Sequence, residues 1–207
     1  MISYLTLRRL IGLLGTFLPL VLFLNALIIF QKGLQSSLSS YYHTGMGDVF
    51  VGALVVIGLF LFSYRGYERK DDIAGDLCCV FAIGLALFPT PPDNPGSGYP
   101  IVGYLHFAFA TSLFLTLIYM ALFLFTKSDP DQPITQKKRR RNMVYRACGI
   151  AMALCILLII ILNVLPADLK SSIDTIKPLF WLETVMIVAF GISWLVKGEA
   201  LGAFMKD

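Results

Sequence analysis

The stretch "LIGLLGTFLPLVLFLNALIIF", residues 10–30, decides the class of protein to which this chain belongs. It has no charged side chain, and its one amide is Asn25. Because an α-helix rises about 1.5 Å per residue, about 20 apolar residues span the hydrocarbon core of a bilayer. The stretch therefore predicts a membrane-spanning helix. Its apolar part is longer than that of a secretion signal and no small-residue cleavage site follows it, so we expect the helix to be retained.

The composition of the whole chain excludes a water-soluble domain. Of the 207 residues, 57% are hydrophobic and 14% are charged, and the mean hydropathy is +0.76. A soluble chain has about 25% charged residues. The sequence thus predicts an all-α integral membrane protein, a bundle of six transmembrane helices that forms a single domain over residues 1–207. The predicted spans are residues 10–30, 48–64, 73–90, 101–126, 147–165 and 178–196.

The distribution of Lys and Arg predicts the orientation of the bundle. With both termini in the cytoplasm, 14 of the 17 cations fall on the cytoplasmic side and three fall outside. Short cytoplasmic loops of membrane proteins are enriched in Lys and Arg, so we expect a multi-pass protein of the bacterial inner (plasma) membrane with cytoplasmic termini. The run "KKRRR", residues 137–141, is expected to contact the headgroups of membrane lipids rather than nucleic acid.

Ionisable side chains inside the predicted spans indicate a polar layer near the outer surface. His106 lies six residues past Pro100, about 9 Å below the boundary at helical rise, and Glu183 lies five residues past Pro178, about 7–8 Å below it. Such groups are costly in a membrane unless they pair, hydrogen-bond or function. Each also has a structural interpretation, since a buried histidine can bond a backbone carbonyl.

The stretch "SSLSSYYHTGMGDVF", residues 36–50, brings further polar groups to the same layer. His43 and Asp48 lie at the outer start of the second span, flanked by Ser39 and Tyr42. Asn25 approaches the layer from the first span. We expect one outward-facing pocket, with Asp48 alternatively explained by the preference of helix N-termini for acidic residues and Asn25 by interhelical hydrogen bonding.

Several motifs together resemble a known family. "YYHTGMGDVFVG" (residues 41–52), "FPT" (88–90), the lone His106, "RNMVYRACG" (141–149) and "FGISWLVKGE" (190–199) resemble a family of six-helix bacterial membrane proteins of unknown function. The resemblance covers essentially the whole chain and implies the six-helix fold, but no activity.

A more distant resemblance is to the CREST superfamily of membrane hydrolases, which includes the ceramidases. Those enzymes use a Ser-x-x-x-His pair, an Asp and further histidines to hold zinc. Ser39 and His43 fit the spacing and Asp48 follows, whereas the six spans and the lack of a His-x-x-x-His pair in the last span depart from the pattern. The resemblance implies zinc held by His43, Asp48, His106 and Glu183, which would also be the catalytic residues, with Ser39, Tyr42 and Asn25 binding substrate.

Three functions remain open from the sequence. The first is a zinc-dependent hydrolase of a lipid or amide substrate, since two histidines and two carboxylates supply enough ligands for Zn²⁺ with an open position. The second is a non-enzymatic lipid-binding, sensing or assembly protein. The third is a small proton-coupled transporter in which Glu183 carries the proton.

Two structural expectations complete the prediction. Gly75, Cys79, Ala82 and Ala86 form a stripe of small residues that predicts close packing of the third span, and the four cysteines are expected to be packing residues. Asp76 is expected to pair with Arg65 or Lys70 as a structural ion pair.

Overall fold

The computed structural model describes residues 3–92, 100–128, 133–200 and 202. Within these ranges every regular element is a helix, so the predicted all-α fold is confirmed. The six long helices are α1 (Tyr4–Ile28), α2 (Gly47–Phe62), α3 (Arg69–Leu87), α4 (Pro100–Tyr119), α5 (Gln136–Val164) and α7 (Pro178–Lys197). The short elements are the 3-10 helix η1 (Ser39–His43), the π-helical turn η2 (Met120–Leu124) that continues α4, and α6 (Ala167–Asp174).

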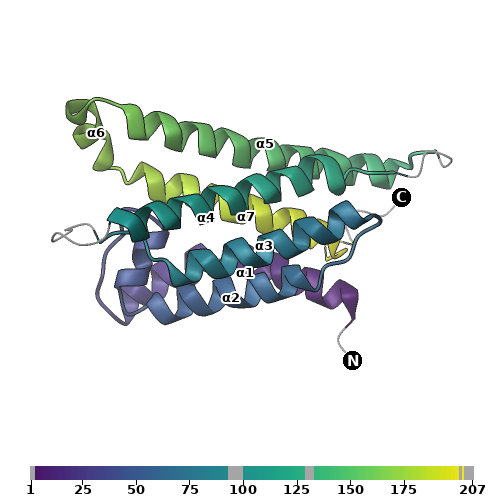
Figure 1. The fold of residues 1–207 in the computed structure, drawn as a ribbon, viewed down its shortest axis with the longest axis horizontal. Helices are drawn as coiled ribbons and strands as arrows, with labels where there is room; N and C mark the ends of the chain where they lie inside the picture. Colours follow the sequence, from purple (N-terminus) through teal and green to yellow (C-terminus); the bar gives the residue numbers. More distant parts are fainter. Residues whose placement is uncertain (1–2, 93–99, 129–132, 201, 203–207) are drawn as a thin grey trace.

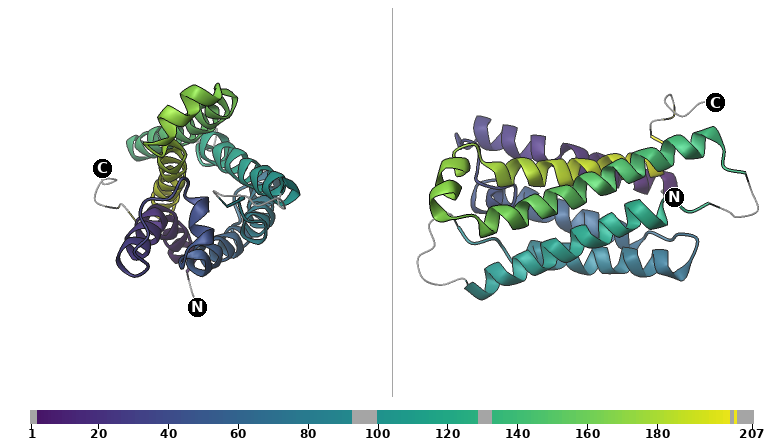
Figure 2. Two further views of the ribbon diagram at one scale, coloured as in Figure 1. Left: turned by 90° about the vertical axis from the view of Figure 1, so that its left-hand side faces the viewer. Right: turned by 90° about the horizontal axis from the view of Figure 1, so that it is seen from above.

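The long helices stand side by side as a ring, which Figure 2 shows end-on. Each packs against its neighbours in the order α1, α2, α3, α4, α5, α7 and back to α1. Helix α7 therefore lies between α1 and α5, and α6 lies at one end of the ring, where the chain turns from α5 into α7 (Figure 1).

Four of the described helices are long and apolar enough to cross a membrane. They are α1, α4 together with η2, α5 and α7. Helix α2 is apolar but has only 16 residues, and the 19 residues of α3 begin with a charged turn that contains Asp71 and Asp72. The chain is therefore a helical membrane protein. The count of six crossings and their orientation remain predictions.

Helix boundaries differ from the prediction mainly at charged ends. Helix α5 begins at Gln136 instead of residue 147, so the basic run of residues 137–141 is helical and not a loop. The Thr135 hydroxyl caps this helix by accepting a 3.2 Å hydrogen bond from the Lys138 N–H. This polar extension, η1 and α6 all lie outside the predicted spans, because hydropathy indicates only the apolar parts of helices.

Glycines allow α1 and α7 to approach closely. A Cβ built on Gly191 would lie 2.7 Å from the Gly12 carbonyl oxygen, and one built on Gly12 would lie 2.7 Å from the Leu195 nitrogen. Helices α2 and α3 meet similarly, because a Cβ on Gly75 would lie 2.6 Å from the Leu61 carbonyl oxygen. The predicted small-residue stripe is buried along this contact, and the four cysteines are buried too.

Two ends of the ring can be distinguished. We call one end the basic end: α1, α3 and α5 begin there, and α2, η2 and α7 end there. The opposite end is called the far end. At the basic end an aromatic cluster fills the ring. Trp194 packs edge-on against Tyr64 at 5.2 Å and against Phe125 at 5.3 Å between ring centroids, and Tyr145 packs against Phe125 at 5.3 Å.

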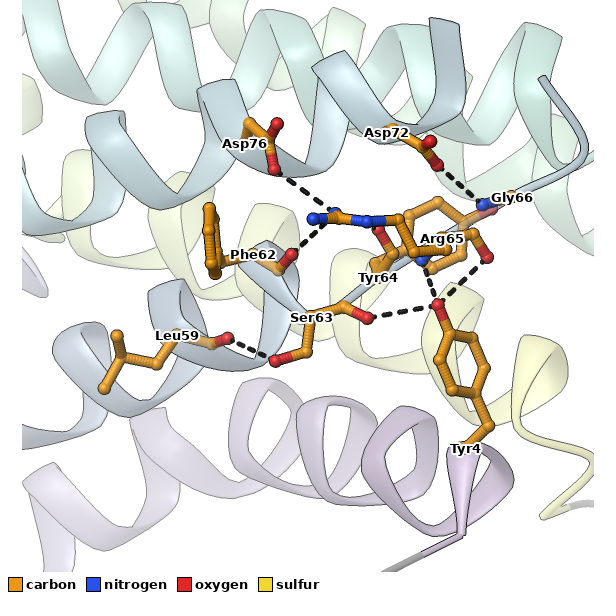
Figure 3. Close-up of polar contacts among 9 residues, drawn as sticks. All are labelled: Tyr4, Leu59, Phe62, Ser63, Tyr64, Arg65, Gly66, Asp72 and Asp76. Atoms are coloured by element: carbon orange, nitrogen blue, oxygen red, sulfur yellow. Dashed lines mark hydrogen bonds and ion pairs between the residues drawn. The ribbon is translucent and has the colours of Figure 1, made fainter. Parts of the chain in front are cut away.

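Hydrogen bonds fasten the α2–α3 connection to α1 at the basic end, as Figure 3 shows. The Tyr4 hydroxyl donates to the Ser63 carbonyl at 3.1 Å and accepts from the Arg65 N–H. Arg65 forms an ion pair with Asp76 at 3.3 Å. One of the two partners expected for Asp76 is thus confirmed.

Candidate functional site

Glu183, at the far end, holds the chain segment that precedes η1. Its Oε2 accepts hydrogen bonds from the backbone N–H groups of Leu38 at 2.6 Å and Ser39 at 3.1 Å. These N–H groups lie at the start of a 3-10 helix, where they lack intrahelical acceptors. The carboxylate therefore acts as a cap supplied by α7 and lies next to Ser39.

The two histidines both contact the segment that ends α3. A ring nitrogen of His106, Nδ1, lies 2.8 Å from the Phe88 carbonyl oxygen, and Nε2 of His43 lies 2.6 Å from the Thr90 carbonyl oxygen. A carbonyl oxygen only accepts, so each of these nitrogens carries a proton. His106 is 3% exposed, which matches the structural interpretation of a satisfied buried histidine.

The remaining predicted site residues are spread over the far end. Asp48 is exposed in the first turn of α2, as expected for an acidic N-terminal residue. Tyr42 packs edge-on against His43 with 5.2 Å between ring centroids. Asn25 donates to the Val21 carbonyl of its own helix at 2.8 Å, which differs from the interhelical hydrogen bond expected of it.

No group of three or more His, Cys, Asp or Glu side chains that could hold a metal ion occurs in the described part of the chain. The zinc set predicted from His43, Asp48, His106 and Glu183 is therefore not assembled in this structure. The physical reason is that three of these side chains hydrogen-bond to separate backbone groups, two at the end of α3 and one at the start of η1.

The basic end contains a cavity of about 720 Å³ that the sequence did not reveal. It is lined by residues from helices α1, α5 and α7 and from two connections, the one between α2 and α3 and the one between η2 and α5. We call it the cationic cavity. Its charged lining consists of Arg8, Lys127, Lys138, Arg141 and Lys197, with the carboxylates of Glu68 and Glu199.

Two of the five cations form ion pairs. Lys127 lies 3.2 Å from both Glu68 and the fully buried Asp71. Burial alone would lower the pKa of Lys127, but the hydrogen bonds and charges of these two carboxylates outweigh it and raise the pKa above the usual lysine value. Arg141 pairs with Glu199 at 2.9 Å and also donates to the Val196 carbonyl.

The other three cations have no carboxylate at ion-pair distance among the described residues. The Lys197 ammonium lies 4.8 Å from the ring centroid of Phe125 and 5.6 Å from that of Tyr67. Lys138 donates to the Phe125 carbonyl at 3.0 Å. The guanidinium of Arg8 lies over an aromatic ring, 5.6 Å from the centroid of Tyr64.

Like charges therefore face one another in the cavity. The positive charges of Arg8, Lys138 and Arg141 all act on Lys197, and the negative charge of Asp71 opposes them. In addition, the buried Nε–H groups of Arg8 and Arg141 have no hydrogen-bond acceptor within the described part of the chain. A buried donor without an acceptor costs about 1–3 kcal/mol, so an anion placed among these groups would be stabilised both by charge and by hydrogen bonds.

Local structure explains how these side chains converge. Lys138, Arg141 and Tyr145 are spaced three and four residues apart on α5, so they share one helix face and point into the cavity. Lys197 ends α7, and the Arg9 Nε–H donates to the neighbouring Gly198 carbonyl at 2.8 Å, which fixes α1 against this end. The sequence contains the same spacing, but it predicts only lipid-headgroup contacts for the basic run, because it does not show which helices lie beside α5.

Compared with known proteins, the chain matches no family model, no curated protein and no solved structure. The resemblances to a six-helix family and to the CREST hydrolases remain predictions.

Proposed function

We propose that this chain is a non-enzymatic membrane protein that binds a phosphate-bearing anion in the cationic cavity. One observation carries the proposal: Arg8, Lys138 and Lys197 line the same cavity, and no carboxylate of the described residues lies at ion-pair distance from any of them. An uncompensated cluster of cations is costly unless a counter-ion joins it. This is the lipid-binding or sensing alternative, relocated from the far end to the basic end.

The proposal includes the placement of the protein in the membrane. All six long helices cross the bilayer, with α2 and the apolar part of α3 completing the ring made by the four long apolar helices. The basic end faces the cytoplasm, since it holds most of the Lys and Arg residues. The cavity then opens at the level of the cytoplasmic headgroups, where both lipid and soluble phosphates are accessible.

Phosphate suits this lining better than other anions do. Guanidinium groups donate two parallel hydrogen bonds to phosphate oxygens, and lysine adds a mobile point charge. The volume of about 720 Å³ lies in the range of small-molecule sites. The cations face a cavity between helices and not an open surface, so nucleic acid is not the proposed partner.

The other two functions depend on the far end. A zinc hydrolase would need His43, His106 and the carboxylates to share one ion, and a transporter would need Glu183 to exchange protons with a pathway. Glu183 instead caps η1, and both histidines bond backbone carbonyls. These contacts favour a structural role for the far end.

The test is the thermal stability of the purified protein in detergent. Sodium phosphate or pyrophosphate should raise the unfolding temperature relative to sodium chloride at equal ionic strength, because a ligand at 100 times its Kd stabilises the folded state by about 2.7 kcal/mol. Lys138→Gln and Lys197→Gln should each reduce this gain.

Arg139→Gln is the matched control, because Arg139 is exposed on the same helix and does not line the cavity. It should leave the gain unchanged. If phosphates gave no more stabilisation than chloride, or if Arg139→Gln reduced the gain as much as Lys138→Gln did, the proposal would be overturned.

A further inference from the structure

The charges of the cationic cavity point to a class of ligand within the proposed function, on which this inference rests. We infer that the cavity takes a diphosphate monoester, a group with two linked phosphates and one organic substituent. The inference depends on three features of the cavity: the number of unpaired cations, their distribution over separate helices, and the space beyond them.

The number of unpaired cations fits the charge of this group. Arg8, Lys138 and Lys197 are three basic side chains with no carboxylate of the described residues at ion-pair distance, and a bound anion would favour the charged form of each. A diphosphate monoester carries roughly two to three negative charges at neutral pH, since its terminal phosphate loses a second proton with a pKa of about 6. The phosphodiester of a common phospholipid carries one charge and would leave most of the cluster uncompensated.

The distribution of the cations also favours two phosphates over one. Arg8 belongs to α1, Lys197 to α7, and Lys138 and Arg141 to α5. Because α1 and α5 pack on different sides of α7 (Figure 2), the cations approach the cavity from opposite sides of the α7 terminus. Because α7 separates α1 from α5, a ligand with two linked phosphates can offer one phosphate to the cation of α1 and the other to the cations of α5.

The free donors are placed on both sides as well. The Nε–H of Arg8 lies on the α1 side and that of Arg141 on the α5 side, and neither has an acceptor among the residues that the structure describes. Each can complete a guanidinium fork on a different phosphate. A diphosphate would satisfy both donors at once, which a monophosphate on either side would not.

The cavity has room for the organic substituent. Its volume of about 720 Å³ exceeds that of two phosphates, and Tyr67, Pro133 and Ile134 give part of it an apolar lining. A prenyl chain from the bilayer and a nucleoside from the cytoplasm are both esterified to diphosphates of this class. The shared chemistry is the diphosphate monoester, and the experiment separates the two sources.

The experiment measures the dissociation constants of a matched series of phosphate compounds for the purified protein in detergent. Each compound is used below its own critical micelle concentration. The probes are three pairs: inorganic phosphate and pyrophosphate, geranyl monophosphate and diphosphate, and adenosine monophosphate and diphosphate. We expect each diphosphate to bind at least about tenfold more tightly than the corresponding monophosphate, the effect of one added charge-assisted hydrogen bond. Tighter binding of geranyl diphosphate than of adenosine diphosphate assigns a lipid source, and the reverse order assigns a nucleotide source.

Variants on the two sides of α7 test the geometry. Arg8→Gln and Lys138→Gln should each reduce the preference for pyrophosphate over phosphate, whereas Arg139→Gln should preserve it. Equal affinity for monophosphates and diphosphates would overturn this inference and leave the proposed function standing. Absence of binding by every probe to the folded protein would overturn both.

Discussion

The ammonium of Lys197 lies 4.8 Å from the ring centroid of Phe125, and no carboxylate among the described residues is at ion-pair distance from it. A cation–π contact contributes about 0.5–2 kcal/mol, so the ring holds the ammonium in place without neutralising its charge. Lys197 therefore remains available to an anion. The same aromatic cluster that closes the basic end thus also positions a charge in the cationic cavity.

The Lys127–Asp71 pair should be important for stability. Asp71 is fully buried, and Lys127 is its cationic partner at 3.2 Å. Lys127→Met should lower the free energy of unfolding by about 1–3 kcal/mol, because the buried carboxylate loses its cationic partner and keeps only the hydrogen bonds from the Glu68 N–H and the Tyr64 hydroxyl. Asp76→Asn is the control. The side chains of Asp76 and of its partner Arg65 are each 47% exposed, so this ion pair should contribute no more than about 1 kcal/mol. Thermal unfolding in detergent measures both, and equal losses would contradict the assignment.

The contribution of Lys127 should also depend on pH in a defined direction. Its folded-state pKa is raised by Glu68 and Asp71, which outweigh the opposing effect of burial. A raised pKa stabilises the fold below the unfolded-state value of about 10.4, and this stability is lost as the pH rises through the folded-state value. The stability difference between wild type and Lys127→Met should be constant from pH 7 to 9 and should shrink only above about pH 10.4. A difference that shrank toward acidic pH would contradict this account.

Glu183 should act as a cap and not as a catalytic group. Glu183→Ala should cost about 1–3 kcal/mol, since the Leu38 and Ser39 N–H groups lose their acceptor, whereas Glu183→Gln retains an acceptor oxygen and should cost less. Limited proteolysis between residues 29 and 46 should be faster in Glu183→Ala. Asn163→Ala, which removes a hydrogen bond within α5, is the control. Complete loss of folding in Glu183→Gln would contradict a capping role.

The contact between α1 and α7 should tolerate no added methyl group. Gly191→Ala would place a Cβ 2.7 Å from the Gly12 carbonyl oxygen, and such overpacking costs about 1–3 kcal/mol. Gly52→Ala is the matched control, since nothing lies within 4 Å of a Cβ at that helical position. The control should be neutral or slightly stabilising. Similar unfolding temperatures for the two variants would show that α1 and α7 do not meet as described.

The sequence predicted the fold to the extent that apolarity determines it. Long uncharged stretches such as residues 10–30 predict helices α1, α4, α5 and α7 directly. An apolar segment inside the bilayer has no water to bond to, so it must form its backbone hydrogen bonds internally, as a helix does. The prediction failed where helices continue into polar sequence. The basic run at the start of α5 is helical because Thr135 caps it and its side chains pack at the basic end, which are tertiary effects that hydropathy does not contain.

The site was harder to predict, because the depth of a residue along its helix does not specify which neighbouring helix its side chain faces. His106 and Glu183 were placed at similar depths, yet one bonds the end of α3 and the other bonds the start of η1. The cationic cavity shows the converse. The i, i+3, i+7 spacing of Lys138, Arg141 and Tyr145 was readable, but the convergence of Arg8 and Lys197 depends on the order of helices in the ring.

The most direct test of the central claim is equilibrium binding of radiolabelled pyrophosphate to the purified protein at low ionic strength. We predict saturable binding at one site per chain. Binding should be lost when Lys138→Gln and Lys197→Gln are combined, and kept when Arg139→Gln and Arg140→Gln remove the same charge from the exposed face of the same helix. Absence of saturable binding, or equal loss in both double variants, would contradict the claim that the cationic cavity is an anion-binding site.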